Sequence, residues 1–249
     1  MKAILGFVLL GVSLSASAES VGELLTMGNE LEAKQRHAEA VEVYLKAESL
    51  RPDNAEILLR IAEQYSRQVV GGSRSPENRR LAGKALEYSE RAVKLDPTKA
   101  KAHLSLAISH GKVAFLESPQ RQIEMSRLIR DEAETAIRLD PRLDDAWYVL
   151  GRWNYELASL NPALKFVASA IYGKLPDASN ERAAECFEKA MVIRPDRVMY
   201  HVELGRAYAA LGQNAKALAE LREGLSLSAR DEEDRQSQDR ARTALKALE

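Results

Sequence analysis

The chain has 249 residues, of which 45% are hydrophobic and 29% are charged, and its 36 basic side chains nearly balance its 37 acidic ones. A single cysteine cannot build a disulfide scaffold or a cysteine-rich zinc site, and a net charge of -1 gives no electrostatic basis for binding nucleic acid. The apolar content is enough for a folded core, and the low numbers of glycine (13) and proline (8) favour helix.

The first 18 residues have the pattern of an export signal. Lys2 supplies a positive charge, residues 4–14 form an apolar run, and Ala16-Ser17-Ala18 presents small residues before Glu19. The apolar run is shorter than the roughly 20 residues that span a bilayer, which favours cleavage over anchoring. We therefore expect an exported chain, periplasmic or secreted after cleavage; the alternative is a chain tethered to the membrane by an uncleaved segment.

The rest of the chain carries a repeated helix-stop signal. An amphipathic run ends in a polar residue followed by proline, which has no N–H and disfavours helix in its predecessor. An alanine stands five residues before each proline, and an alanine or glycine stands ten residues after it, where a small side chain lets two helices approach closely. This pattern predicts a series of antiparallel helix hairpins. The prolines are Pro52, Pro97, Pro141 and Pro195.

We expect five hairpin repeats and then a capping helix that covers the open end of the stack. In the capping helix, Ala241, Leu245 and Leu248 form one apolar stripe, and acidic residues in the first turn suit the helix dipole. The expected repeats are residues 21–54, 55–99, 100–143, 144–197 and 198–230, with the capping helix at 231–248.

The spacing of the prolines predicts insertions in three repeats. Successive prolines lie 45, 44 and 54 residues apart, whereas an unmodified repeat has about 34 residues. Ser75-Pro76 and Ser118-Pro119 each offer an N-cap and a proline at the first helical position, so the second helices of repeats two and three should start early. In repeat four, Asn161-Pro162 should start an extra short helix that ends at Gly173.

This hairpin pattern resembles the tetratricopeptide repeat, whose two helices carry W-x2-L-G-x2-Y and A-x3-F-x2-A, followed by proline. Repeat four matches the first helix through Trp147, Leu150 and Gly151, while repeat two has Ser89 where an aromatic residue is expected. The resemblance implies an all-α, tetratricopeptide-like solenoid that is not an enzyme and needs no cofactor. Repeat one matches without gaps through Leu24, Met27, Gly28, Leu31, Ala40, Tyr44, Ala47 and Pro52.

The insertions carry a narrower resemblance. The run 147–158, the short insertion that follows it, the helix at 183–195 and the acidic run 231–234 look like the regulator of microtubule dynamics family, over about residues 54–247. The resemblance implies a helical repeat domain. Animal members are membrane-anchored proteins associated with microtubules or mitochondria, and lipid binding by the repeat domain is also reported in the family. An exported chain would not meet microtubules, so we do not expect microtubules as its partner.

The first helices of such repeats line a concave face, which is the usual binding surface of a solenoid. Two arginines there, flanked by apolar and aromatic side chains, suit a carboxylate or phosphate with an apolar tail alongside. The competing interpretation is that the arginines form ordinary surface ion pairs with Glu63 or Asp145. The candidate ligand-binding residues are Leu104, Ile108, Tyr148, Arg152, Tyr155, Val202 and Arg206.

The remaining candidate sites favour structural roles. His103 and His110 lie seven residues apart, not at the i, i+4 spacing of a helical metal site, and His201 shares the repeat position of His103, so we expect packing and no metal. Cys186 should be a buried apolar residue, with a reactive thiol as the alternative. The short helix at 162–172 should pack on its neighbour; the alternatives are that it closes the groove or contacts a membrane surface.

Two functions remain open from the sequence. The first is an interaction module that binds a peptide or partner protein in its concave groove. The second is a lipid-binding or lipid-transfer domain that holds an anionic amphiphile in the same groove.

Overall fold

The computed structural model describes residues 20–71, 73–173 and 177–248, and within these residues the chain is helical and has no strand. The predicted all-α class is therefore confirmed. The expected export signal, residues 1–18, lies outside the described residues. The helices are α1 (Val21–Ala33), α2 (His37–Leu50), α3 (Ala55–Gln68), α4 (Pro76–Leu95), α5 (Ala100–Phe115), α6 (Pro119–Leu139), α7 (Asp144–Ala158), α8 (Pro162–Tyr172), α9 (Asn180–Ile193), α10 (Val198–Ala210), α11 (Asn214–Ser226) and α12 (Glu232–Leu248).

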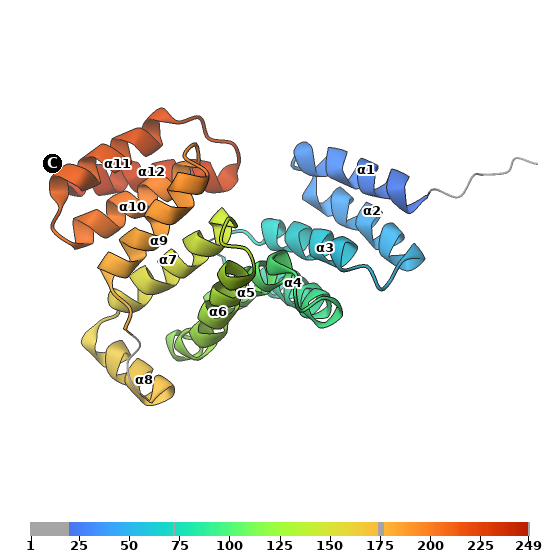
Figure 1. The fold of residues 1–249 in the computed structure, drawn as a ribbon, viewed down its shortest axis with the longest axis horizontal. Helices are drawn as coiled ribbons and strands as arrows, with labels where there is room; N and C mark the ends of the chain where they lie inside the picture. The colour runs from blue at the N-terminus through green and yellow to red at the C-terminus, as the bar shows by residue number, and fades with distance from the viewer. Residues whose placement is uncertain (1–19, 72, 174–176, 249) are drawn as a thin grey trace, which may run out of the picture.

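The helices form hairpins that follow one another along a curved path, from blue α1 to red α12 (Figure 1). The hairpins are α1/α2, α3/α4, α5/α6, α7/α9 and α10/α11, and each lies inside one of the expected repeat ranges. Helix α8 is an extra element between α7 and α9, and α12 follows the last hairpin.

Glycines in the first helix of a hairpin leave room for an aromatic ring from the second. A Cβ atom added at Gly28 would lie 2.2 Å from Cε1 of Tyr44, and one added at Gly151 would lie 2.6 Å from Cε1 of Phe187. Both aromatic side chains are fully buried. The close helix approach that the small residues predicted is therefore confirmed at these positions.

Repeat two differs at the position of the buried aromatic ring. Ser89 stands at the aromatic position and is fully buried. Its hydroxyl oxygen lies 2.8 Å from that of Ser105 and 2.9 Å from that of Ser109, both on α5. Ser89 thus links repeat two to repeat three by hydrogen bonds, where repeats one and four pack an aromatic ring inside their own hairpin.

The insertions lengthen two helices and add a third. Helices α4 and α6 have 20 and 21 residues, against 14 in α2. The Ser75 and Ser118 side chains accept hydrogen bonds from the third backbone N–H of their helices, as the sequence predicts. Helix α8 has Asn161 as its N-cap and ends at Gly173, whose φ of 75° suits a residue without a side chain.

Helix α8 packs on the neighbouring helices, which confirms the expected structural role. Its Ala168 is fully buried in a cluster with Ile123 of α6 and Trp153 of α7. The hydroxyl oxygen of Tyr172 lies 2.5 Å from that of Ser126 on α6. Phe166, in contrast, is 78% exposed.

Helix α12 covers the end of the stack. Its Ala241 is fully buried against Val202 of α10 and Leu221 of α11. At its start, the guanidinium of Arg197, the residue before α10, donates to Asp231 and Asp234, each at 3.0 Å. Asp234 is fully buried, so this ion pair ties the capping helix to the last hairpin.

The two ends of the solenoid approach each other. In Figure 1 the α1–α2 turn faces the loop that precedes α12. The Gln35 side chain in that turn donates a 3.4 Å hydrogen bond to the carbonyl oxygen of Arg230. The superhelix therefore curves back on itself, so that its two ends are in contact.

Candidate functional site

A fully buried carboxylate, Glu203 of α10, lies where three helices meet. Arg206 of α10 approaches it at 2.6 Å, Arg240 of α12 at 3.4 Å and Arg152 of α7 at 3.8 Å. A buried charge is costly unless it is paired, so these three guanidiniums account for the ionised carboxylate. We call Glu203 and its three arginines the arginine cluster.

The arginine cluster stays partly open to solvent. The side chains of Arg152, Arg206 and Arg240 are 35%, 27% and 36% exposed, whereas that of Glu203 is 0% exposed. Arg152 also donates to Glu156 at 2.9 Å. Nε of Arg152 and Nε of Arg240 are buried and have no hydrogen-bond partner, and the partly exposed arginine side chains suit an anionic group of a ligand, because guanidiniums bind carboxylates and phosphates with two parallel hydrogen bonds.

Tyrosines from α7 line one side of the cluster. The guanidinium of Arg206 lies 4.8 Å from the ring centroid of Tyr155, at cation–π distance. Arg152 donates to the Tyr148 hydroxyl at 3.4 Å. Tyr148 is buried against Phe187 and Tyr200, and this burial raises its pKa to about 12, so the hydroxyl stays protonated at neutral pH.

The structure brings four of the seven predicted residues together: Tyr148, Arg152, Tyr155 and Arg206. Leu104 and Ile108 belong to a separate apolar cluster between α5, α6 and α7. Val202 is fully buried beneath α12, so the expectation that it lines an open surface is wrong. Its burial results from the capping helix packing on α10.

The ion-pair partners of the arginines differ from the two that we considered. Glu63 pairs with Arg67 at 2.7 Å, and Asp145 accepts a 2.7 Å hydrogen bond from the Tyr200 hydroxyl. The repeat pattern did not reveal Glu203, although it precedes Arg206 by three residues, a spacing that puts two side chains on one helix face. Nor did it reveal Arg240, because we assigned the last helix only a capping role.

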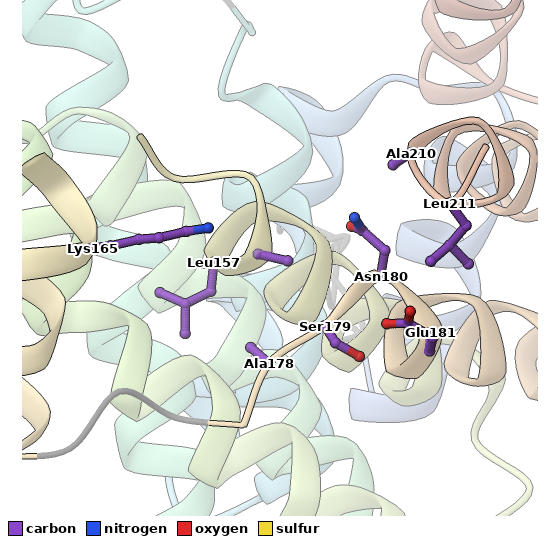
Figure 2. Close-up of a pocket in the computed structure, with 9 residues that line it drawn as sticks. Leu157, Lys165, Ala178, Ser179, Asn180, Glu181, Ala210 and Leu211 are labelled. Atoms are coloured by element: carbon purple, nitrogen blue, oxygen red, sulfur yellow. The ribbon is translucent and has the colours of Figure 1, made fainter. Parts of the chain in front are cut away.

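Two hollows lie away from the arginine cluster. Figure 2 shows one of 320 Å³, formed by the ends of α7 and α10, the start of α9 and Lys165 of α8. The second, of 420 Å³, lies between α6, α7 and α9 and is lined by Trp153 and Cys186 among others. None of the seven predicted ligand-binding residues lines either hollow.

Cys186 is buried, as expected. Burial raises the pKa of its thiol to about 11, although Lys189 opposes the shift. The thiolate is the reactive form of cysteine, so the thiol of Cys186 is protonated and unreactive at neutral pH.

The described residues contain neither a cluster of metal-ligating side chains nor a helix that could cross a membrane. Within 20–71, 73–173 and 177–248, no three His, Cys, Asp or Glu side chains come together as metal ligands. Over the same residues, every helix is too short or too polar to cross a membrane.

The curved stack of hairpins is a tetratricopeptide-like solenoid. A thermophilic tetratricopeptide-repeat protein from Thermus thermophilus superposes with a TM-score of 0.65, over 91% of this chain and 99% of that protein, at 18% identity. The MamA protein gives 0.51 over 83% and 90%, at 21% identity. These similarities show the fold.

Residues 24–249 match the family described as regulator of microtubule dynamics protein 1-3, and the chain belongs to this family. It is 30% identical to regulator of microtubule dynamics protein 3 of Xenopus laevis over 222 residues, which are 88% of this chain and 48% of the relative. For protein 2 of Homo sapiens the identity is 28%, over 75% of this chain and 46% of the relative. The chain thus spans about half the length of these relatives. Family and fold together indicate a helical-repeat interaction module.

Proposed function

We propose that the chain binds a carboxylate-bearing segment of a partner protein in its concave groove, at the arginine cluster. One observation supports this most directly. The three guanidiniums converge from α7, α10 and α12 on one buried carboxylate, and each keeps at least a quarter of its side chain exposed.

The buried carboxylate gives the cluster a pre-organised geometry. Glu203 holds the arginine side chains in place before any ligand arrives, which lowers the entropy cost of ordering them on binding. The partly exposed arginine side chains then pair with acidic groups of the partner, and the Tyr155 ring offers an apolar contact beside them.

Native mass spectrometry of the protein purified from its own cells tests this proposal. We expect a bound polypeptide on the wild type. The double variant Arg152→Gln with Glu203→Gln removes a cation together with its buried counter-charge, and should lose that polypeptide while its helical circular dichroism is unchanged. Glu156→Gln is the matched control, because it leaves all three arginines and the buried carboxylate in place, and it should retain the polypeptide.

The lipid-binding alternative gives a different result in the same experiment. A phospholipid mass on the wild type, lost in the double variant, would contradict the polypeptide proposal and support an anionic amphiphile in the groove. A polypeptide retained by the double variant would show that binding does not use these residues.

We further propose that residues 1–18 direct export and are removed, so that the partner is met outside the cytoplasm. The charge, apolar run and small residues of this segment support the proposal. The mass of the purified chain tests it: a chain that begins at Glu19 agrees, and a chain that retains Met1 in the membrane fraction favours a tether. Cosedimentation of the protein with microtubules in its own cells would contradict export.

A further inference from the structure

Three first helices carry a ring N–H donor at the same repeat position, six residues after the loop proline. In α7 the donor is the indole nitrogen of Trp147, which lies 2.9 Å from the carbonyl oxygen of Pro141. In α5, Nε2 of His103 lies 2.9 Å from the carbonyl oxygen of Pro97. In α10, Nε2 of His201 lies 2.8 Å from that of Pro195. An indole nitrogen only donates, so the shared geometry identifies both Nε2 atoms as donors.

The other ring nitrogen of each histidine faces a carboxylate on the second helix of the same repeat. Nδ1 of His103 lies 2.6 Å from Oε2 of Glu132, and Nδ1 of His201 lies 2.8 Å from Oε2 of Glu220. A neutral imidazole has one donor and one acceptor nitrogen. Because both nitrogens face acceptors here, the doubly protonated ring satisfies both contacts.

Repeat four has the uncharged Cys186 at the second-helix position where repeats three and five have Glu132 and Glu220. Trp147 has no second ring nitrogen, and Nζ of Lys189 on α9 lies 4.2 Å from its ring centroid. The position therefore occurs in two forms, an imidazole that faces a carboxylate in repeats three and five and an indole without such a carboxylate in repeat four. This pairing of ring and charge supports an imidazolium in the histidine repeats.

We propose that the rings of His103 and His201 are protonated on both nitrogens, that each ties the loop between two repeats to the following hairpin, and that the joint at His201 weakens as the pH rises. Each histidine contacts the preceding loop and the second helix of its own repeat while it is part of the first helix. It therefore fixes the angle between successive repeats, and so the curvature of the groove.

The charged groups around the rings agree with this assignment. Burial by itself would lower the pKa of His201, but the hydrogen bond to Glu220, the Pro195 carbonyl and the nearby Glu223 outweigh it and raise the pKa. His103 faces Glu132 of α6.

His110, two turns further along α5, provides an internal contrast. Its Nδ1 is buried and has no hydrogen-bond partner. Burial lowers the pKa of His110, although Glu132 of α6 and Glu90 of α4 oppose the shift. His110 should therefore be neutral at neutral pH, in contrast to His201, whose pKa is raised.

NMR of the imidazole nitrogens in the full chain tests the proposal between pH 5 and 10, with each histidine assigned by its His→Gln variant. We expect both rings to be doubly protonated at pH 7 and that of His201 to titrate above the ordinary value of about 6.5, while His110 is neutral at pH 7. A neutral ring at pH 7 for either His103 or His201 would overturn the proposal.

A second measurement asks whether the joints support the fold. A group whose pKa is raised on folding contributes stability that is fully present below its unfolded pKa and is lost as the pH rises through the folded pKa. The wild type should therefore lose resistance to urea as the pH rises above about 6.5, and Glu132→Gln with Glu220→Gln should reduce that loss. Lys189→Gln, beside the indole of repeat four, is the matched control and should keep the wild-type loss. An unchanged loss in the double variant would contradict the proposed joints.

Discussion

Replacing Glu203 by glutamine removes the carboxylate on which three guanidiniums converge. Glu203 is 0% exposed and has Arg206 at 2.6 Å, Arg240 at 3.4 Å and Arg152 at 3.8 Å. Breaking a buried ion pair by removing one partner costs about 3–5 kcal/mol. The three arginine side chains are 27–36% exposed. Because water screens part of the lost ion pairing, we expect a cost of about 2–3 kcal/mol.

Urea unfolding followed by circular dichroism measures this cost. Glu203→Gln should lower the unfolding midpoint without a change in the urea dependence of the free energy of unfolding. Glu156→Gln removes the other carboxylate that contacts Arg152, but Glu156 is 58% exposed, so we expect a cost of about 0.5 kcal/mol or less. Equal midpoints for the two variants would refute the assignment of Glu203 as the centre of the cluster.

Three further predictions concern packing, thiol reactivity and the capping helix. Gly151→Ala places a Cβ 2.6 Å from Phe187 and should destabilise the fold by about 1–3 kcal/mol, which lowers the thermal midpoint. Gly83→Ala, at an exposed position of α4 with no atom within 4 Å, should stabilise the fold by about 0.5–1 kcal/mol and raise the midpoint. Midpoint shifts of the same sign in both variants would contradict the packing argument. Cys186 should resist a thiol reagent at pH 8 in the native protein and react after unfolding, and fast native labelling would show that it is accessible. Arg197→Gln removes the charge that pairs with two acidic residues at the start of α12, so amide exchange in α12 should accelerate relative to α2; unchanged exchange would show that apolar packing alone holds the helix.

Local patterns predicted the features that depend on one or two neighbouring turns. The N-caps at Ser75 and Ser118 and the glycine at position 151 act over one helix or one hairpin, and the structure confirms them. Ser89 is harder to interpret from sequence, because its hydroxyl replaces an aromatic ring only through partners on the next hairpin.

The candidate site depends on contacts that the repeat pattern does not contain. Arg240 reaches Glu203 only because α12 packs across α10, and the same packing buries Val202. The angle at which α12 packs depends on how its side chains fit against those of α10 and α11 together, and no single repeat position determines it. The repeat positions of Arg152 and Arg206 therefore predict that both lie at the site, but they do not predict the carboxylate of Glu203 between them.

Site-specific photo-crosslinking in the cells that make the protein tests the proposed function most directly. A photoreactive amino acid would replace Tyr155, beside the arginine cluster, or as a control Val192, which is 81% exposed at the end of α9. We predict a covalent adduct with a polypeptide from position 155, absent from position 192, and lost when Arg152→Gln and Glu203→Gln are added. A polypeptide adduct that forms equally from both positions, or an adduct with lipid alone at position 155, would contradict binding of a partner protein at the arginine cluster.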